Sequence, residues 1–155
     1  MMDVSGVINV LKPPGMTSND VVVTLRRKLR IKKVGHTGTL DPAAAGVLPI
    51  CIGRATRLAE YITSELKTYR AEMVLGIETD TLDAEGRIIS RSEKLPDIEK
   101  IHKTFKQYQG KIKQQPPMYS AIKHKGKPLY SLARKGQHID IPYREVMLYK
   151  NNIIR

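Results

Sequence analysis

The 155-residue sequence predicts an α+β fold with a mixed or mostly antiparallel sheet flanked by helices and loops. Short apolar runs and period-2 alternation, typical of strands, are interspersed with segments whose apolar residues recur every three or four positions. The first strands are joined through helices, whereas the later ones return directly, as hairpins do. Hydrophobic residues make up 41% of the chain and charged residues 27%, a balance typical of globular rather than disordered proteins.

The first strand and the first helix are predicted by an apolar run and by a helix cap. Residues 6–11 are mostly apolar and are followed by the turn sequence KPPG. Thr17 and Asp20 have the spacing of a capping box, with Asp in place of the commoner Glu. Apolar residues then recur at helical spacing and predict a helix of about three turns: Val21, Val22, Leu25 and Leu29.

The same periodicities predict the remaining elements. We expect an ordered loop at 32–46 and a buried strand at 47–53. A helix packed through Leu58 and Ile62 is expected at 54–62, and a half-buried strand with Tyr69 on its apolar face at 69–75. An acidic loop and a returning strand follow at 76–86 and 87–90. A helix ended by Gly110 is expected at 98–108. An irregular basic segment at 111–142 should contain a short helix at 129–134, and a last strand region follows at 143–154.

Charge and cysteine content indicate the class of partner and the compartment. The chain has 27 Lys and Arg against 15 Asp and Glu, and this net charge of +12 favours a polyanionic partner, nucleic acid before an anionic membrane surface. Two segments contain no acid: 21–40, with six Lys and Arg, and 111–139, with seven. Cys51 is the single cysteine and cannot form an internal disulfide, so a reducing cytoplasm is expected. No run approaches the roughly 20 apolar residues of a membrane span.

The most informative segment is a glycine-punctuated loop at residues 35–49, with the sequence GHTGTLDPAAAGVLP. It contains one carboxylate, Asp41, one imidazole, His36, and two hydroxyls ahead of a buried strand. Pro42 biases Asp41 away from helical backbone angles. A single acid between basic segments is expected of a nucleophile or general base acting on an anionic substrate. The residues alone also allow an Asp-Pro turn whose carboxylate bonds its own loop.

Five motifs in chain order resemble those of the pseudouridine synthase family that includes the tRNA T-loop enzyme. They are GVINVLKPPGMTS at 6–18, the loop at 35–49, KTYR at 67–70, TDTLDAEG at 79–86, and PPMYSAIK at 116–123 together with Leu129 and Tyr130. The resemblance implies a pseudouridine synthase fold in which residues 1–155 are the N-terminal part of the catalytic domain, with an RNA-gripping insertion at about 111–142. It further implies that a uridine in the T loop of tRNA is flipped out and isomerised, with no cofactor and no metal.

The resemblance also assigns roles to individual residues, with Asp41 as the nucleophile. It implies that Tyr69 stacks on the uracil and that His36 fills the space left by the flipped base. Asp83 would hold the flipped nucleotide or the active-site network. Lys12 and Arg57 would lie at the rim of the site or contact a phosphate. An RNA clamp on the insertion would comprise Tyr119, Lys123, Lys125, Lys127, Tyr130 and Arg134.

Simpler interpretations stay open for most of these residues. His36 is also consistent with a histidine that hydrogen-bonds the loop backbone, and Tyr69 with a tyrosine in the core of a strand. The cations, Lys12 and Arg57 among them, are each consistent with ordinary solvated surface charge.

One departure from the family pattern affects the predicted function. The family's catalytic domain continues with a KGTYIR-type segment, whose arginine faces the nucleophile, and then with an RNA-binding C-terminal domain. The fold is therefore expected to be incomplete at its C-terminus, with the chain being either a fragment or one of two polypeptides. Two alternatives to a tRNA isomerase stay open: a non-catalytic RNA-binding fragment, and the catalytic subunit of an RNA-guided complex. The letters MTSND at 16–20 favour the stand-alone tRNA enzyme over the latter.

Overall fold

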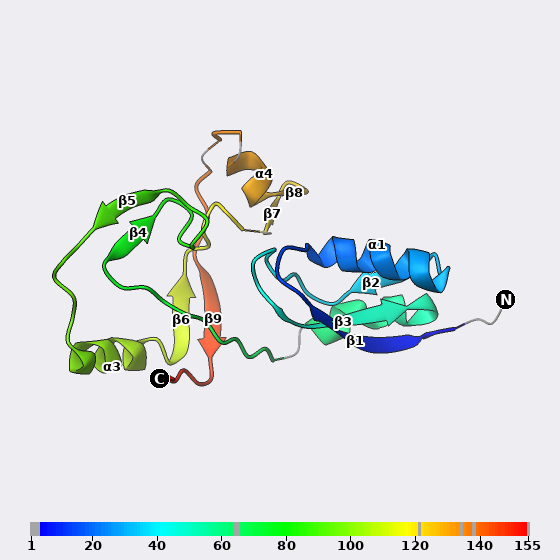
Figure 1. Ribbon diagram of the computed structural model, residues 1–155, viewed down its shortest axis with the longest axis horizontal. Helices are drawn as coiled ribbons and strands as arrows, with labels where there is room; N and C mark the ends of the chain where they lie inside the picture. The colour runs from blue at the N-terminus through cyan, green and yellow to red at the C-terminus, as the bar shows by residue number, and fades with distance from the viewer. Residues whose placement is uncertain (1–3, 64–65, 121, 134, 138, 155) are drawn as a thin grey trace. The chain divides into compact units, whose positions relative to one another are not determined.

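The computed structural model describes residues 4–63, 66–120, 122–133, 135–137 and 139–154. The chain divides into two compact units, Met1–Arg70 and Ala71–Arg155, each with its own strands and helices (Figure 1). The α+β class is confirmed, and every strand pair among the described residues is antiparallel. Within the described ranges, no helix combines the length and the apolar character needed to cross a membrane.

The core of the first unit, among the described residues, is formed by a three-stranded sheet and one α-helix packed on it. Strands β1 (Gly6–Lys12), β3 (Gly46–Ile52) and β2 (Val34–His36) lie in the order β1-β3-β2. Helix α1 (Ser18–Leu29) packs on this sheet, because its apolar residues recur on one face. Burial of helix and sheet side chains together forms the core, which consists of Val21, Val22, Val34, Leu48, Ile50 and Ile52.

Helix α1 begins at the capping box that the sequence predicts. The Asp20 N–H donates to Thr17 Oγ1 at 3.1 Å, and the Thr17 N–H donates to the Asp20 carboxylate at 2.9 Å. Hydrogen bonds from the Thr17 side chain and then its backbone hold the pKa of Asp20 below the ordinary value. Arg30 ends the helix in the left-handed region, with φ of 56° and its N–H donating to the Arg26 carbonyl.

The helix predicted at 54–62 is divided into two shorter ones. Helix η1 (Gly53–Leu58) is a 3-10 helix, and α2 (Ala59–Thr63) is a short α-helix. Leu58 is 51% exposed, so the prediction that it packs into the core is wrong, whereas Ile62 is half-buried. Three residues per turn in the 3-10 part rotate Leu58 off the face that it would share with Ile62 in a continuous α-helix.

Among its described residues, the second unit contains strand pairs and two helices. Strand β4 (Ile77–Thr79) pairs with β5 (Ile88–Arg91). Strand β6 (Gly110–Gln114) pairs with β9 (Arg144–Leu148), and β7 (Lys123–His124) pairs with β8 (Lys127–Pro128). The predicted helices are present as α3 (Ile98–Gln107) and α4 (Leu129–Ala133). The segment 111–142 is therefore less irregular than expected, because its beginning pairs with β9 and its middle closes a hairpin.

Residues 69–75 form no strand, so the prediction of a half-buried strand there is wrong. The side chains of this segment are exposed, Tyr69 at 69% and Met73 at 60%. Alternation decides which side chains share a face, but a strand exists only through backbone hydrogen bonds to a neighbour. No described strand pairs with 69–75. The reverse holds inside the predicted loop at 32–46, where Val34–His36 becomes β2 because β3 pairs with it.

Candidate active site

The loop between β2 and β3 is fixed on both sides of Asp41. Before it, the Leu40 N–H donates to Ser18 Oγ at 2.9 Å, and Ser18 Oγ donates to the Leu40 carbonyl at 3.2 Å. After it, the Gly15 N–H donates to the Pro42 carbonyl at 2.8 Å. The first turn of α1 and the turn after β1 therefore determine where Asp41 lies. Ser18 is buried and was not singled out from the sequence, although it ends the MTS motif that precedes the helix.

The Asp41 side chain is exposed, and no described residue hydrogen-bonds to its carboxylate. The loop does turn at this point, but the Ala44 N–H closes the turn on the Asp41 carbonyl, at 3.0 Å, rather than on the carboxylate. By contrast, the carboxylates of Asp20 and Asp97 cap helices. An unoccupied carboxylate on a fixed backbone is available to attack an electrophilic carbon or to stabilise developing positive charge.

Lys12 does not lie at the rim of a site. Its side chain is 0% exposed, and its ammonium donates to the carbonyls of Pro13, Met16 and Pro42 at 2.9, 2.8 and 3.3 Å. These three acceptors use all three ammonium donors. The predicted phosphate or rim contact is therefore wrong, and so is the alternative of a solvated surface charge. Lys12 instead joins the turn after β1 to the residue that follows Asp41.

His36 ends β2, opposite Ile50 in the sheet register. Its side chain is half-buried, and its Nδ1 is buried with no hydrogen-bond partner among the described residues. The alternative of a histidine that bonds the loop backbone gains no support at Nδ1. The neighbouring Thr37 holds the loop instead: it is 4% exposed, and its N–H and hydroxyl donate to the Pro49 carbonyl at 3.1 and 3.4 Å.

The two glycines on either side of His36 and Thr37 are not required by the packing of the protein. Among the described residues, a Cβ added at Gly35 would meet nothing within 4 Å, and one at Gly38 would meet only Lys67 Cε, at 4.0 Å. Neither glycine has a positive φ. Because the protein leaves room for a side chain at both positions, a ligand can approach the backbone closely there.

Arg57 and Tyr69 belong to the same unit as Asp41, but no interaction among the described residues joins either to the Asp41 loop. Arg57 is exposed on η1 and forms no ion pair with a described residue. Tyr69 is 69% exposed in an irregular segment, so the alternative of a strand-core tyrosine is wrong. Within the described part of the chain, no group of His, Cys, Asp or Glu has the makings of a metal site.

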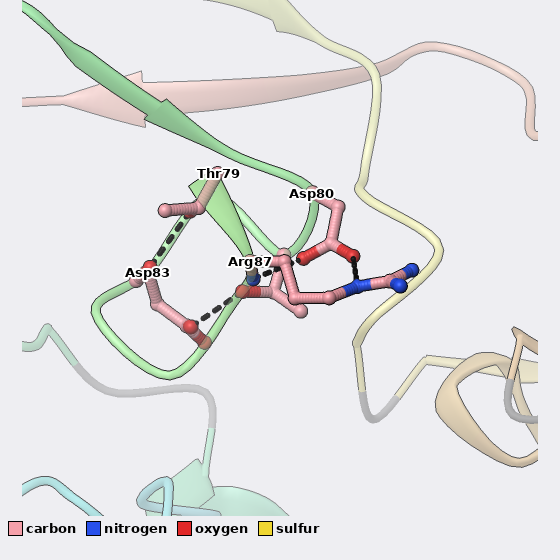
Figure 2. A network of polar contacts seen from close by, with 5 residues as sticks. Thr79, Asp80, Asp83 and Arg87 are labelled. Carbon is pink, nitrogen blue, oxygen red and sulfur yellow. Dashed lines mark hydrogen bonds and ion pairs between the residues drawn. The ribbon is translucent and has the colours of Figure 1, made fainter. Parts of the chain in front are cut away.

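Figure 2 shows the acidic loop between β4 and β5, where the Asp83 carboxylate is used by the loop itself. Asp83 Oδ1 accepts from the Thr81 hydroxyl at 2.6 Å and from the Glu85 N–H at 2.9 Å. The Asp83 carbonyl accepts from the Thr79 hydroxyl at 2.7 Å. Asp83 lies in the second unit, and its observed contacts shape the loop.

The partnership of Asp80 with Arg87 was not expected from the sequence. Asp80 Oδ1 accepts from the Arg87 N–H at 2.9 Å, and Oδ2 forms an ion pair with Arg87 Nε at 3.4 Å (Figure 2). Gly86 is needed beside them, because a Cβ there would collide with Thr81 Oγ1 and lie 2.7 Å from Asp80 Oδ1. The sequence feature that could have indicated this pair is that Asp80 and Arg87 stand at opposite ends of one short, glycine-containing loop.

The predicted clamp residues that the structure describes lie on and around a tight hairpin in the second unit. Strands β7 and β8 are joined by a two-residue turn, Lys125 and Gly126, whose φ values of 48° and 81° are those of the turns favoured in hairpins. Lys125 and Lys127 are exposed. The two tyrosines predicted for the clamp are partly exposed, Tyr119 at 45% and Tyr130 at 41%. Two further predictions fall outside what the structure describes, namely Arg134 and the side chain of Lys123.

Known proteins are similar to this chain over nearly its whole length. The chain is 54% identical over 150 residues to tRNA pseudouridine synthase B of Alkaliphilus oremlandii. The aligned region covers 97% of this chain and 50% of that protein. The chain is 53% identical over 155 residues to tRNA pseudouridine synthase B of Caldanaerobacter subterraneus subsp. tengcongensis, covering 99% of this chain and 54% of that one. The chain thus spans about half the length of the curated relatives it matches.

A solved structure and a family match agree with these relatives. A chain in the crystal structure of a Cbf5-Nop10-Gar1 complex is 32% identical, covers 77% of this chain and 31% of its own length, and superposes with a TM-score of 0.52. Residues 26–155 match the family described as TruB family pseudouridylate synthase (N terminal domain). This match includes Asp41 and its loop, the acidic loop and the hairpin, so the chain belongs to the TruB family of pseudouridylate synthases.

Proposed function

We propose that this chain is the N-terminal part of the catalytic domain of an isomerase that converts a uridine in the T loop of tRNA to pseudouridine. The observation that carries the proposal is Asp41, whose carboxylate is exposed and unbonded among the described residues while Leu40 and Pro42 are held on either side. The relatives at 54% and 53% identity are both named tRNA pseudouridine synthase B, which supports tRNA as the substrate class.

The two alternatives have less support. The chain of the Cbf5-Nop10-Gar1 complex is only 32% identical, so an RNA-guided assembly is not favoured over a tRNA enzyme. A non-catalytic RNA-binding fragment would have no need of a carboxylate held free of the protein's own hydrogen bonds. Retention of His36 and Tyr69 with Asp41 also favours catalysis.

The reaction breaks the N1–C1′ glycosidic bond, turns the base, and joins C5 to C1′. The proton on C5 is lost and N1 regains a proton, so atoms and electrons balance without a redox partner or group donor. The uridine must leave its stack first, at a cost of a few kcal/mol. Asp41 acts as a nucleophile, or as a charge stabiliser, at the sugar or the base of the flipped nucleotide.

The remaining site residues position the RNA. In this proposal His36 fills the space left by the flipped base, Tyr69 stacks on the uracil, and Arg57 contacts a phosphate. Asp83 supports the flipped nucleotide through the loop that its carboxylate orders. The absence of a positive φ and of close neighbours at Gly35 and Gly38 supports a close approach of RNA to the backbone there.

The insertion at about 111–142 grips the RNA in the same proposal. The exposed lysines of its hairpin, Lys125 and Lys127, lie in a segment without acids between 111 and 139, which supports phosphate contacts. Tyr119 and Tyr130 are exposed enough to stack on bases. Residues 1–155 would then be the N-terminal part of one catalytic domain, with this clamp inserted in it. The enzyme would work in the cytoplasm, as expected of one that acts on tRNA.

The first experiment replaces Asp41 by Asn, which keeps the shape and removes the charge. Turnover of unmodified tRNA, followed by mass spectrometry of its nucleosides, should fall below about a tenth of wild type, while tRNA affinity stays within a few-fold. Glu93→Gln is the matched control, because it removes an exposed acid outside the Asp41 loop. Residual turnover above about a tenth of wild type would overturn the assignment of Asp41.

The second experiment tests whether the activity requires the other half of the relatives' length. The family's arginine opposite the nucleophile should hold and orient Asp41, and a misplacement of about 1 Å can reduce a rate on the order of a hundredfold. Adding the second half of the Alkaliphilus oremlandii relative, fused to this chain or as a second polypeptide, should therefore raise turnover at least tenfold. Equal rates for residues 1–155 and the extended protein would show that the residues named here suffice.

A further inference from the structure

The end of α1 and the turn after it carry a concentrated positive charge. Six Lys and Arg lie within residues 26–33, all exposed, and no acid occurs from 21 to 40. This α1 basic patch consists of Arg26, Arg27, Lys28, Arg30, Lys32 and Lys33. It surrounds a hollow of about 630 Å³, which four of these residues line together with Val23 and Ile31.

Two of the six members of the patch have structural roles, and no such role is seen among the described residues for the side chains of the other four. Arg26 Nη2 donates to the Val34 carbonyl at 2.8 Å, and Arg30 ends α1 in the left-handed region. Arg27, Lys28 and Lys32 make no hydrogen bond or ion pair with a described residue. Cations in the last turn of a helix do favour its dipole, but that effect falls off within the turn and does not account for Lys32.

The patch lies at a fixed distance from Asp41, because both belong to the first unit and one helix connects them. Ser18, at the start of α1, is hydrogen-bonded to Leu40, next to Asp41. A rise of about 1.5 Å per residue places Arg27 about 14 Å further along the axis. This distance corresponds to a few base pairs of a nucleic-acid stem.

We propose that the α1 basic patch binds backbone phosphates of the base-paired stem that adjoins the target loop. Guanidinium and ammonium groups spaced along a helix end match a row of phosphates, and the absence of acids leaves nothing to repel them. Arg27, Lys28 and Lys32 thus set the affinity for the stem and leave the reacting uridine untouched. The inference rests on the proposed function and adds to it a second RNA surface, outside the clamp and the Asp41 loop.

The test compares binding of two RNAs to the full 155-residue chain over a series of salt concentrations. One RNA is a T-arm hairpin with its whole stem, and the other is an oligonucleotide with the loop sequence alone. The test variant is Arg27→Gln, Lys28→Gln, Lys32→Gln, which spares the structural Arg26 and Arg30. The matched control is Lys94→Gln, Lys103→Gln, Lys106→Gln, which removes equal charge from exposed positions on and before α3, beside Asp97 and Glu99.

For the hairpin, the slope of log affinity against log salt should flatten by about two to three units in the test variant, since each lost phosphate contact removes about 0.7 to 0.9. The loop oligonucleotide and the matched control should show less than half that change. A charge-conserving variant, Arg27→Lys, Lys28→Arg, Lys32→Arg, should bind as wild type does, which assigns the effect to charge rather than to side-chain shape. Retained binding of the loop oligonucleotide by the test variant itself shows that this variant is folded.

Three outcomes would overturn the inference: an unchanged slope for the hairpin, an equal change for the loop oligonucleotide, or an equal change in the matched control. Tight wild-type binding with any of these leaves the proposed function intact. Failure of the wild-type chain to bind either RNA would contradict the proposed RNA-binding function, and this inference with it.

Discussion

Around Asp41, side chains divide into those that hold the loop and those that face outward. Lys12, Ser18 and Thr37 are buried, and the polar atoms of each bond to backbone groups. A buried ammonium is tolerated only when its donors are satisfied, so Lys12 makes the position of the loop depend on the three carbonyls that it binds. Asp41 faces outward and makes no such bond among the described residues, as expected of a group kept for substrate.

At the residue scale, glycine substitutions should separate folding from function. We predict that Gly38→Ala leaves the free energy of unfolding within about 0.5 kcal/mol of wild type, because its Cβ has room and φ is not positive. Turnover should fall at least several-fold, because the methyl group occupies space that the RNA needs. Urea denaturation and nucleoside mass spectrometry measure the two effects; loss of stability without loss of turnover would contradict the prediction.

Gly53 provides the contrasting case for that experiment. It has a φ of 61°, and a Cβ would collide with the Val4 carbonyl and Ser5 Oγ. Gly53→Ala should therefore lower the free energy of unfolding by more than about 1 kcal/mol. The two variants carry the same chemical change, so a difference between them reports the local backbone and packing.

At the element scale, the start of α1 links helix stability to the site. Ser18 is the first residue of this helix and also fixes Leu40, so fraying of the first turn would release the Asp41 loop. We predict that Thr17→Ala lowers the free energy of unfolding by about 1 kcal/mol, since it removes the acceptor of the Asp20 N–H. Turnover should fall with it. Thr24→Ala, within the same helix but away from its cap, is the control.

The Asp20 carboxylate should make the stability of α1 depend on pH. Its pKa is lower in the folded protein than its ordinary value of 3.8, because Thr17 hydrogen-bonds to the ionised form. Its stabilisation is therefore fully present above pH 3.8 and is lost as the pH falls through the lowered folded-state pKa. The stability difference between wild type and Asp20→Ala should shrink in urea titrations below that pH, and a constant difference would contradict the assignment.

At the scale of the whole molecule, burial is unequal between the two units. The cluster of fully buried apolar residues lies in the first unit, whereas α3 fully buries none of its own. An apolar groove of about 880 Å³ runs along α3, lined in part by Met73, Ile101 and Phe105. Large side chains near the end of the chain are also exposed, such as Tyr143 and Tyr149 at 66% and 67%.

This difference predicts separate local stabilities. Amide hydrogens of β1 and β3 should exchange slowly, because their ladder closes over the buried core, while those of α3 and of β6 paired with β9 should exchange much faster. Hydrogen-exchange mass spectrometry of the 155-residue chain measures both in one experiment. Equal protection of the two units would show that they unfold together.

The sequence by itself determined the local elements and singled out the loop that contains Asp41. Helix α1, with its capping box, follows from short-range periodicity and side chain–backbone hydrogen bonds, which need only neighbours in the chain. The same holds for α3 and for β1. Asp41 was found because the residues around it are distinctive in type and order. These features depend on separations of a few residues, which a single sequence displays directly.

Only the tertiary structure decided which strands pair and which polar groups are used up in holding the fold. Residues 69–75 have the alternation of a strand but no partner, and Val34–His36 becomes a strand because β3 lies beside it. Lys12 looks in the sequence like any surface cation, yet the carbonyl of Pro42, 30 residues away, helps to bury it. Pairing and burial are set by contacts between distant segments, and no pattern within a short window contains them.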